Sequence, residues 1–408
     1  ILDANGEVLA KTVFRYDVNA DPSMVGPVKR NVNGLESEIS VTEQVAELAA
    51  ILQLDEQLIF EKIQGTGRYS NLKKRVDAAT FRELRELGIP WLYFDALQDR
   101  LYPSGAVAGN LLGFVGDDGK PLAGLERQLN SCLAGVDGQE TFERSVGGVK
   151  IPGSAIVTQR ASDGMDAKIT IEADLQYFAQ QQVARAVTDL KAEWGTAIVL
   201  EVKTGRILAA AEAPTVDPND PAAAAAADRG ARTFQAIIEP GSTIKTLTVA
   251  SLIDTGMVGP ETQVVAPYKY KLPWGDIIKD SYKHEDQRLT LTGVLRNSSN
   301  TGLVQIGDDV PVSTRFEYLE KFGLGKASGI NFEGESGGIF ESYKSWDGLT
   351  KLTTMFGQGM ATTPLQVASA YQAIANGGER ISPRLVDGCI TKSGELVSQP
   401  KQTNTRVV

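Results

Sequence analysis

The sequence predicts a two-domain α+β protein whose second domain packs an antiparallel sheet between helices. The chain has 408 residues, more than the roughly 100–200 residues of a usual single domain, so at least two folded units are expected. Near residue 160 a glycine-dense stretch gives way to clear strand and helix patterns, which divides the chain into domains 1–160 and 161–408. Strands that alternate with helices beyond this boundary indicate the sheet and its helical cover.

The first domain is expected to combine a hairpin, helices and loops. Residues 1–10 alternate around Asn5-Gly6, a dipeptide that suits a type I′ turn between two short strands. Apolar residues recur at helical spacing over residues 41–64, and a second helical pattern covers residues 78–87. Glycine is dense over residues 100–153, which predicts loops and short strands.

The second domain opens with a strand, a helix and a hairpin. Residues 167–171 have the pattern of a strand, and an apolar face at helical spacing follows over residues 175–190. Two β-rich runs, 196–202 and 206–211, flank Lys203-Thr204-Gly205, which predicts an antiparallel hairpin. The six alanines that follow Pro221 fit either a helix or a loop, and they are assigned to neither.

Charge and hydropathy exclude two classes of partner. The formal net charge is −10 with a pI near 4.9, and no basic run with interleaved aromatic residues occurs, which argues against nucleic acid as a partner. No stretch of about 18 consecutive apolar residues occurs, so no segment is expected to span a bilayer by itself. The chain starts at Ile1 with no recognisable targeting segment.

The two cysteines, Cys132 and Cys389, lie far apart and lack CxxC spacing. The sequence therefore predicts neither a disulfide framework nor a thiolate metal site. We expect two separate buried thiols, with a pair between them as the open alternative.

A serine and a lysine three residues apart carry the chemical prediction. Ser242 follows the helix breaker Pro240-Gly241, and Lys245 precedes an apolar helical run that stops at Gly256. The apolar residues of this run are Leu247, Ala250, Leu252 and Ile253. On a helix this spacing places the Ser242 hydroxyl and the Lys245 amine on one face, where a neutral amine can take the hydroxyl proton. Backbone N–H groups at the helix start would stabilise a developing oxyanion.

The S-x-x-K pattern alone is weak, because two other segments match it. Residues 70–73 lie in a polar, basic stretch, and residues 398–401 contain a proline inside the would-be helical turn. Both are interpreted as solvated chance matches.

A second element raises Ser242 above these matches. The polar cluster at residues 297–301 separates two apolar stretches and contains Ser298-x-Asn300, which is the only S-x-N in the chain. On a tight turn Ser298 can relay a proton while Asn300 holds a substrate amide. Taken alone, the cluster fits an ordinary capping turn equally well.

With these two motifs in this order, the chain resembles the penicillin-recognising serine transpeptidases, and within them the class B penicillin-binding proteins. The likeness extends over nearly the whole chain. The further segments that carry it are Ile1-Leu2-Asp3, Asn5-Gly6, Leu9-Ala10, Arg100-Leu101-Tyr102-Pro103, Gly124-Leu125-Glu126, Phe356-Gly357-Gln358-Gly359, Thr363-Pro364-Leu365-Gln366 and Ala375-Asn376-Gly377-Gly378. The segment from Asp280 to Asn300 looks most like the cell-division member of the class, with elongation-type relatives as the alternative.

This resemblance implies a D,D-transpeptidase that acylates Ser242 with a D-Ala-D-Ala stem peptide and passes the acyl group to an amine. Lys245 would be the base, Ser298 and Asn300 would shuttle protons and position the peptide, and β-lactams would acylate Ser242. The residues expected to bind substrate are Gly241, Ser299, Thr301, Gly357, Gln358 and Gly359. The resemblance implies no cofactor and no metal.

The resemblance also implies an architecture and partners. Domain 1–160 would be an elongated, non-catalytic pedestal, and domain 161–408 the transpeptidase domain. One N-terminal membrane anchor, absent from this chain, would hold the catalytic domain outside the cytoplasm. A membrane glycosyltransferase and other division proteins would be its partners.

The chain departs from the family at the third motif, K-[ST]-G on a strand after the GQG segment. Lys203-Thr204-Gly205 precedes Ser242, and Lys392-Ser393-Gly394 has the surroundings of a hairpin turn. Residues 392–394 remain a minor candidate for the catalytic element. We expect the true motif to lie beyond Val408 or in a missing stretch, so that the C-terminal part of the domain is missing.

Several alternatives stay open. A serine D,D-carboxypeptidase or β-lactamase would let water attack the acyl-enzyme, whereas a β-lactam sensor or a pseudoenzyme scaffold would not turn over.

His284, the only histidine, is interpreted as structural because Ser242 lacks a G-x-S-x-G elbow. Residues 357–359 lack the pattern of a phosphate loop. The aromatic residues ahead of Ser298 fit core or rim packing better than a substrate cleft; they are Tyr268, Tyr270, Trp274 and Tyr282.

Overall fold

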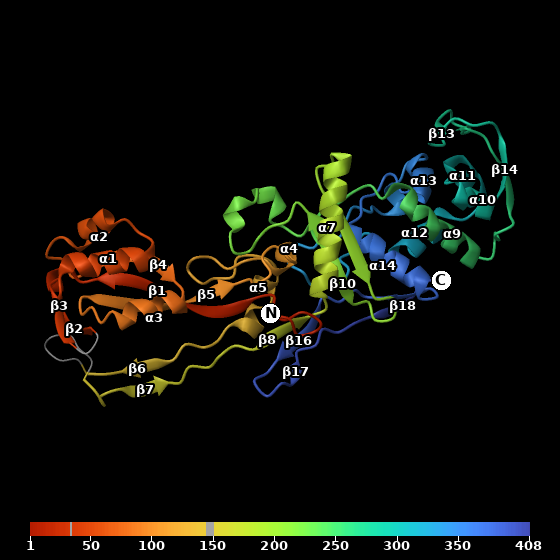
Figure 1. Cartoon of the computed structure of the whole chain (residues 1–408). Helices are drawn as coiled ribbons and strands as arrows, with labels where there is room; N and C mark the ends of the chain where they lie inside the picture. The colour runs from red at the N-terminus through yellow and green to blue at the C-terminus, as the bar shows by residue number, and fades with distance from the viewer. Residues whose placement is uncertain (33–34, 144–150) are drawn as a thin grey trace. The chain divides into compact units, whose positions relative to one another are not determined.

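The computed structural model describes residues 1–32, 35–143 and 151–408. By its contacts the chain forms two compact units, shown in Figure 1. The smaller unit is Ala10–Tyr102 with Asp117–Gly119, and the larger comprises Ile1–Leu9, Pro103–Gly116 and Lys120–Val408. The boundary near residue 160 was inferred from the change in sequence pattern there, and it stays a prediction.

The smaller unit is a three-stranded antiparallel sheet covered by helices. Its central strand β1 (Lys11–Ala20) lies between β4 (Ser70–Val76) and β5 (Leu92–Leu101), with Lys11 opposite Leu101 and Ala20 opposite Leu92. A separate hairpin pairs β2 (Val28–Val32) with β3 (Leu35–Ile39). Buried apolar side chains from the sheet and its helices form one core, around Val18, Leu48, Leu52, Ile59, Leu84 and Trp91.

The helices of this unit follow the predicted periodicity, with one break. The pattern over residues 41–64 forms two helices, α1 (Val41–Leu52) and α2 (Glu56–Ile63), because Gln53 adopts a left-handed conformation and Asp55 caps the second helix. At the start of α1, Ser40 and Glu43 form a capping box. The second predicted helix is confirmed as α3 (Ala78–Glu86).

The larger unit begins with the predicted turn, although not with the predicted geometry. Leu2 pairs with Val8 across the turn and with Lys168 of the next sheet. The Asp3 carboxylate accepts hydrogen bonds from the backbone of Asn5 (2.7 Å) and Glu7 (2.8 Å). Gly6 has a positive φ of 94° but Asn5 does not, so the expected type I′ turn is wrong and an Asp3-centred loop replaces it.

Residues 100–153 contain more helix than expected. Short helices contribute buried Leu111, Leu112 and Leu125, and they alternate with glycine-rich turns that masked the helical pattern. The elements of this stretch are α4 (Gly109–Leu112), α5 (Gly124–Gln128), α6 (Asn130–Leu133) and β6 (Gln139–Thr141), which pairs with β7 (Ile156–Gln159).

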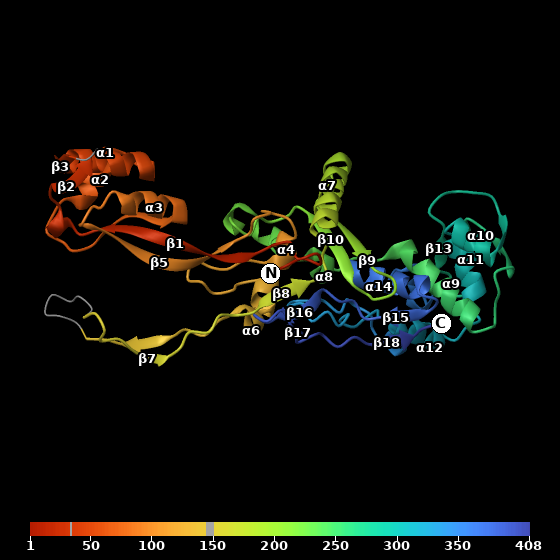
Figure 2. The same cartoon turned by 60° about the horizontal axis from the view of Figure 1, so that its bottom comes forward.

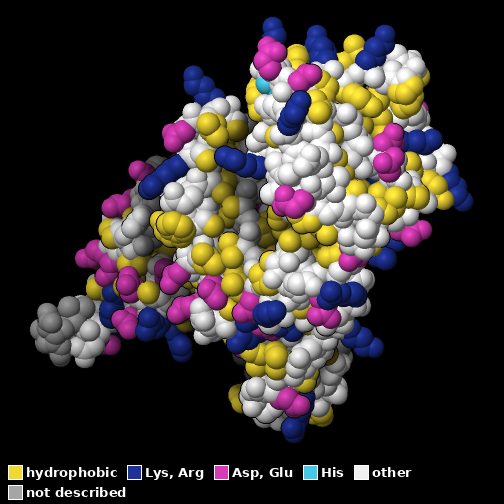
Figure 3. Space-filling view, turned by 90° about the vertical axis from the view of Figure 1, so that its right-hand side faces the viewer, with side chains coloured by type: hydrophobic (Ala, Val, Ile, Leu, Met, Phe, Trp, Pro, Cys, Tyr) yellow, Lys and Arg dark blue, Asp and Glu magenta, His cyan; other side chains and the backbone are white. Residues whose placement is uncertain are grey.

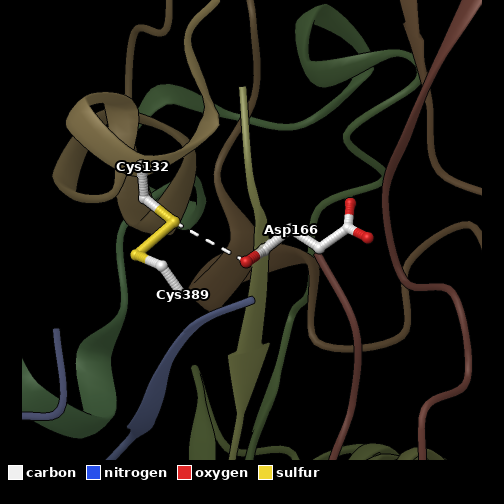
Figure 4. The surroundings of a disulfide bond; sticks show 3 residues. All are labelled: Cys132, Asp166 and Cys389. Carbon is white, nitrogen blue, oxygen red and sulfur yellow. Dashed lines mark hydrogen bonds between the residues drawn. A yellow bond between two sulfur atoms is a disulfide. The ribbon is translucent and has the colours of Figure 1, made fainter. Parts of the chain in front are cut away.

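A disulfide ties α6 to a small sheet formed from distant segments. The strand order is β17-β16-β8, built from β8 (Asp166–Ile169), β16 (Val386–Ile390) and β17 (Leu396–Val397), which lie side by side in Figure 2. Figure 4 shows Cys132 of α6 bonded to Cys389 of β16, with the Asp166 carbonyl beside the Cys132 sulfur. The expectation of two separate thiols is therefore wrong. The two cysteines lie 257 positions apart in the sequence, which left no local signal for the pair.

The predicted antiparallel hairpin between helices is confirmed. Strands β9 (Gly195–Leu200) and β10 (Ile207–Ala213) pair through the turn at residues 203–205, and side chains alternate between the two faces. Ala197, Ala209 and Ala211 pack against α7 (Ala173–Leu190), seen beside β10 in Figure 1. Thr196 and Ile198 point to the other face, where they line a cavity with residues of α14 (Pro364–Ala375).

The remaining elements of the larger unit include α9, which contributes to two buried clusters. One cluster lies around Leu252, Leu291 and Leu303, and the other lies around Ile244, Leu247 and Phe322. The helices are α8 (Arg232–Gln235), α9 (Lys245–Asp254), α10 (Leu291–Arg296), α11 (Asn300–Gly307), α12 (Val312–Lys321) and α13 (Thr350–Thr353). The 3-10 helices are η1 (Pro22–Met24, in the smaller unit), η2 (Pro221–Ala223), η3 (Ala226–Asp228), η4 (Gly241–Ile244), η5 (Tyr343–Ser345) and η6 (Thr354–Phe356). The strand pairs are β11 (Gln263–Ala266) with β14 (Gln287–Thr290), β12 (Lys269–Lys271) with β13 (Ile277–Lys279), and β15 (Glu379–Ile381) with β18 (Asn404–Arg406).

Surface charge is mixed on the face that Figure 3 shows, where acidic and basic side chains are interspersed with hydrophobic ones. Over the described ranges of the chain, no helix combines the length and apolar character needed to cross a membrane.

Removal of the disulfide is expected to destabilise the larger unit. A bond that closes a loop of this length restricts the unfolded chain, and its loss costs up to about 4 kcal/mol. The double variant Cys132→Ala/Cys389→Ala should melt at a lower temperature than the unmodified chain in calorimetry without reductant. A reductant should lower the melting temperature of the unmodified chain but not that of the double variant; equal melting temperatures without reductant would contradict the assignment.

Candidate active site

The candidate nucleophile lies on a helical turn that the core holds in place. Gly241 adopts a φ of 56° and starts the 3-10 turn η4, and α9 continues from Lys245. Ile244 and Leu247 are fully buried on the inner side of this turn, so the exposed Ser242 is fixed on the outer side. The predicted place of Ser242 at the start of a helix is confirmed.

Ser298 connects the lysine to the serine. The Lys245 Nζ donates a hydrogen bond to Ser298 Oγ at 2.9 Å, and Ser298 Oγ donates to Ser242 Oγ at 3.0 Å. Lys245 Nζ also donates to the Ser298 carbonyl oxygen. The sequence predicted a proton-accepting amine at Lys245 and a proton-relaying hydroxyl at Ser298, and the structure places the Ser298 hydroxyl between the Lys245 amine and the Ser242 hydroxyl. Such a row of polar hydrogens can pass a proton in either direction.

Burial increases the fraction of the Lys245 amine that is neutral, and so able to accept a proton, relative to an exposed lysine. The residue is 1% exposed, and removal from water disfavours the charged ammonium. This burial lowers the pKa of Lys245 to about 8, against the opposing effect of the Asp280 charge. A substantial fraction of the amine is therefore neutral near physiological pH, a condition that the sequence could not establish.

The turn between α10 and α11 aims Ser298 at this amine. Ser298 adopts a left-handed conformation with φ 54°, which is uncommon for a residue with a side chain. Its hydroxyl and carbonyl oxygens both reach Lys245 as a result. The next residue, Ser299, caps α11 by accepting a hydrogen bond from Gly302 N at 3.0 Å.

The other residues of the S-x-N segment have unequal roles. Asn300 is half-buried, and its side-chain amide donates to the Lys279 carbonyl at 2.8 Å. Ser299 and Thr301 are 2% and 0% exposed, and their hydroxyls bond Asp280 and the Pro267 carbonyl. This geometry gives Ser299 and Thr301 a positioning role in place of the expected contact with substrate.

The GQG segment packs directly against the nucleophile turn. Gly357 adopts a φ of 80°, and its carbonyl accepts a hydrogen bond from Gly241 N at 3.0 Å. A Cβ at Gly357 would lie 2.1 Å from the Gly241 carbonyl oxygen. Gly359 N donates to a Glu239 carboxylate oxygen at 3.2 Å, and Gln358 is exposed. Glycine at position 357 therefore sets the place of the turn that carries Ser242.

The remaining motif matches lie elsewhere. Residues 70–73 belong to strand β4 of the smaller unit, and Lys401 lies in an exposed segment without helix. Both K-[ST]-G matches are hairpin turns, as expected. Lys203 bonds the Asn376 side chain at 2.9 Å, and Lys392 forms an ion pair with Asp163 at 2.6 Å.

Sequence reasoning missed one residue of the site, Asp280. Its buried carboxylate accepts hydrogen bonds from the backbone of Asn300 (2.5 Å) and Thr301 (3.0 Å). No motif marked it, because its role depends on a contact across 20 residues of chain. His284 bonds this carboxylate, which confirms the structural interpretation of that histidine.

Surroundings of the site include a cavity and exposed aromatic rings. A cavity of about 350 Å³ extends from Pro240 and Thr243 to Tyr371 of α14 and Trp194 before β9. Trp274 is 54% exposed and bonds Asp276, whereas Tyr268 and Tyr282 contact the His284 ring. Within the part of the chain that the structure describes, no group of three or more His, Cys, Asp or Glu side chains could hold a metal ion.

Two family profiles match the chain. The profile described as penicillin binding protein transpeptidase domain matches residues 195–408, a range that contains Ser242, Lys245, Ser298 and Asn300. The chain belongs to the penicillin-binding proteins. A second profile, penicillin-binding protein dimerisation domain, matches residues 1–169. The resemblance inferred from the two motifs is thereby confirmed.

Curated relatives and a solved structure agree with this family. Penicillin-binding protein PbpB of Mycolicibacterium smegmatis is 33% identical, over 100% of this chain and 65% of its own. Peptidoglycan D,D-transpeptidase FtsI of Escherichia coli is 30% identical, over 93% of this chain and 62% of its own length. The crystal structure of penicillin binding protein 3 from Mycobacterium tuberculosis, complexed with ampicillin, is 32% identical with a TM-score of 0.69, over 77% of this chain and 66% of that chain. This penicillin-binding protein thus spans less than two thirds of the curated relatives' length.

Acylation of Ser242 is expected to depend on the protonation of Lys245. Only the neutral amine can accept the hydroxyl proton, so the rate of acylation by benzylpenicillin should rise as the pH rises through about 8. Stopped-flow rates over a pH series measure this profile. Lys392→Met, which removes the exposed lysine of the K-S-G turn, should leave the profile unchanged, and a flat profile in the unmodified chain would exclude Lys245 as the base.

Gly357→Ala is expected to slow acylation because the added Cβ must push the Gly241 carbonyl away. Displacements of about 1 Å near a reacting group can slow a reaction on the order of 100-fold. Gly377→Ala is the matched control, since Gly377 also has a positive φ of 67° but has open space around its Cβ position. Equal acylation rates in the two variants would show that the contact with Gly241 is unimportant.

Proposed function

We propose that this penicillin-binding protein is a peptidoglycan D,D-transpeptidase that works through an acyl-enzyme on Ser242. The observation that carries the proposal is the row of hydrogen bonds from the buried Lys245 amine through Ser298 to Ser242. Taking an amine out of water costs stability even where hydrogen bonds satisfy it, so a purely structural lysine would gain little from this position.

The first step forms an ester and releases an amine. Ser242 Oγ attacks the carbonyl of the D-Ala-D-Ala amide while its proton passes through Ser298 to Lys245. The C–N bond breaks, and the terminal D-Ala leaves after receiving a proton back through the same residues. Backbone N–H groups at the start of η4 and α9 would stabilise the oxyanion of the tetrahedral intermediate.

The second step transfers the acyl group. An amine of a neighbouring stem peptide attacks the ester and loses a proton to the Lys245–Ser298–Ser242 relay. The new amide forms, and Ser242 is freed. Asn300 is the first residue of α11 and follows Ser298 by two positions. Its half-buried side-chain amide would hold the peptide backbone of the donor. A β-lactam would follow only the first step, because its leaving amine stays tethered in the opened ring.

The setting proposed for this reaction is septal cell-wall synthesis outside the cytoplasm. The disulfide between Cys132 and Cys389 supports an oxidising compartment. The likeness of the Asp280 to Asn300 segment to the cell-division class supports the septal role. A membrane anchor, a glycosyltransferase partner and other division proteins are proposed from the same likeness, as is the division of the chain into a pedestal and a transpeptidase domain near residue 160.

A non-catalytic β-lactam-binding or scaffold protein is the second candidate. It is favoured by one observation, that both K-[ST]-G matches are turns tied to residues away from Ser242. A D,D-carboxypeptidase or β-lactamase would share the first step and differ only in the attack by water.

Intact-protein mass spectrometry after incubation with benzylpenicillin tests the proposal. We expect a single stable adduct in this chain and none in Ser242→Ala. Lys73→Ala, which alters the S-x-x-K match of the smaller unit, should react like the unmodified chain. A lasting adduct excludes a β-lactamase. Release of more than one equivalent of D-Ala per chain from a peptide donor, only when an acceptor amine is present, separates transpeptidation from hydrolysis. An unreactive but folded chain would contradict the enzymatic proposal.

A further inference from the structure

The start of helix α11 is held by one buried carboxylate. Asp280 Oδ1 accepts hydrogen bonds from Asn300 N (2.5 Å) and Thr301 N (3.0 Å), and Oδ2 accepts one from Ser299 Oγ (2.8 Å). These donors follow Ser298 directly in the chain. The position of the Ser298 turn therefore depends on where the Asp280 side chain is held.

Asp280 is itself held by the only histidine of the chain. His284 Nε2 lies 3.1 Å from Asp280 Oδ2, and His284 Nδ1 lies 2.7 Å from the Glu285 carbonyl oxygen. The two side chains are 7% and 4% exposed. The rings of Tyr268 and Tyr282 contact the imidazole at centroid distances of 6.0 and 5.4 Å.

These contacts fix the protonation of the imidazole. A carbonyl oxygen can only accept, and the Asp280 carboxylate already accepts bonds from backbone N–H groups and a hydroxyl. Both ring nitrogens must therefore donate, which requires the imidazolium form. A neutral ring would place an unprotonated nitrogen against an oxygen lone pair in a buried contact.

We propose that His284 is a positioning residue, whose imidazolium locks Asp280 against the start of α11 and thereby orients Ser298 and Asn300 toward Lys245 and the substrate. The proposal goes beyond a structural histidine because it assigns a charge state and a route of action. Its consequence for catalysis rests on the proposed function, whereas the His284–Asp280–α11 connection does not.

Charge neutralisation is the second effect of this arrangement. The Asp280 carboxylate raises the pKa of Lys245 and so favours the inactive ammonium, against the effect of burial. A cation at His284 offsets the negative charge of Asp280. The same residue pair can thus orient Ser298 without cancelling the lowering of the Lys245 pKa that burial causes.

The connection is expected to weaken as the pH rises through the raised pKa of His284. The pKa of His284 is raised, first by its bond to the Glu285 carbonyl and then by Asp280 and Asp286. A raised pKa means that the contact contributes its full stability below the ordinary value of about 6.5 and loses it as the pH rises through the raised value. The charged groups that act on the imidazole are Asp280 and Asp286, and the contacting rings are those of Tyr268 and Tyr282.

The charge state can be measured without resonance assignment, because the chain has one histidine. Long-range ¹H–¹⁵N spectra of the labelled chain should show two protonated ring nitrogens and a pKa above about 6.5. Asp280→Asn should lower this pKa, and Ser242→Ala should leave it unchanged. A neutral tautomer at pH 6.5 in the unmodified chain, or an unchanged pKa in Asp280→Asn, would overturn the proposal.

The route of action is tested by amide hydrogen exchange, which needs no catalysis. In His284→Asn the amides of Asn300 and Thr301 should exchange on the order of tenfold faster, with protection in α9 unchanged. Lys283→Gln, an exposed neighbour, is the matched control. Where the unmodified chain reacts with penicillin, His284→Asn should lower the acylation rate constant more than the affinity for penicillin. Unchanged protection at residues 300–301 would overturn the proposal, whereas absence of any acylation would contradict only the proposed function.

Discussion

The site depends on lowering the pKa of one buried amine, so that part of it is neutral near physiological pH. Lys245 is 1% exposed, and such burial is costly unless the amine is well hydrogen-bonded. Both oxygens of Ser298 meet this need. The same bonds that satisfy the amine also connect it to the Ser242 hydroxyl. Stability and reactivity are therefore set by one contact, and the elements around it serve to hold Lys245 and Ser298 at bonding distance.

Three rigid features maintain that distance, and each constrains the backbone. Ser298 is held in a left-handed conformation between two short helices. Gly357 lets the chain pass against Gly241 where a side chain would collide. Asp280 fixes the first amides of α11. Backbone constraints of this kind recur at reactive sites, because a preorganised site needs no rearrangement during the reaction.

The sequence predicted the elements whose signals are local. The S-x-x-K spacing and the breaker before it located Ser242 and Lys245, and the alternating runs located the β9–β10 hairpin. Features set by long-range contacts were missed. The Cys132–Cys389 bond joins residues 257 positions apart, and the inward orientation of Ser299 and Thr301 depends on Asp280. The short helices within residues 100–153 were hidden because glycines interrupt any periodic pattern there. Burial of Lys245 likewise required the packed structure.

The relay from Lys245 through Ser298 to Ser242 is the central claim, and a double-mutant cycle measures it most directly. The observable is the rate of Ser242 acylation by benzylpenicillin in Lys245→Ala, in Ser298→Ala and in the double variant. If the two residues act as one unit, the double variant should react no more slowly than the slower single variant. Losses that simply add in the double variant would show that Lys245 and Ser298 act independently, and would contradict the relay.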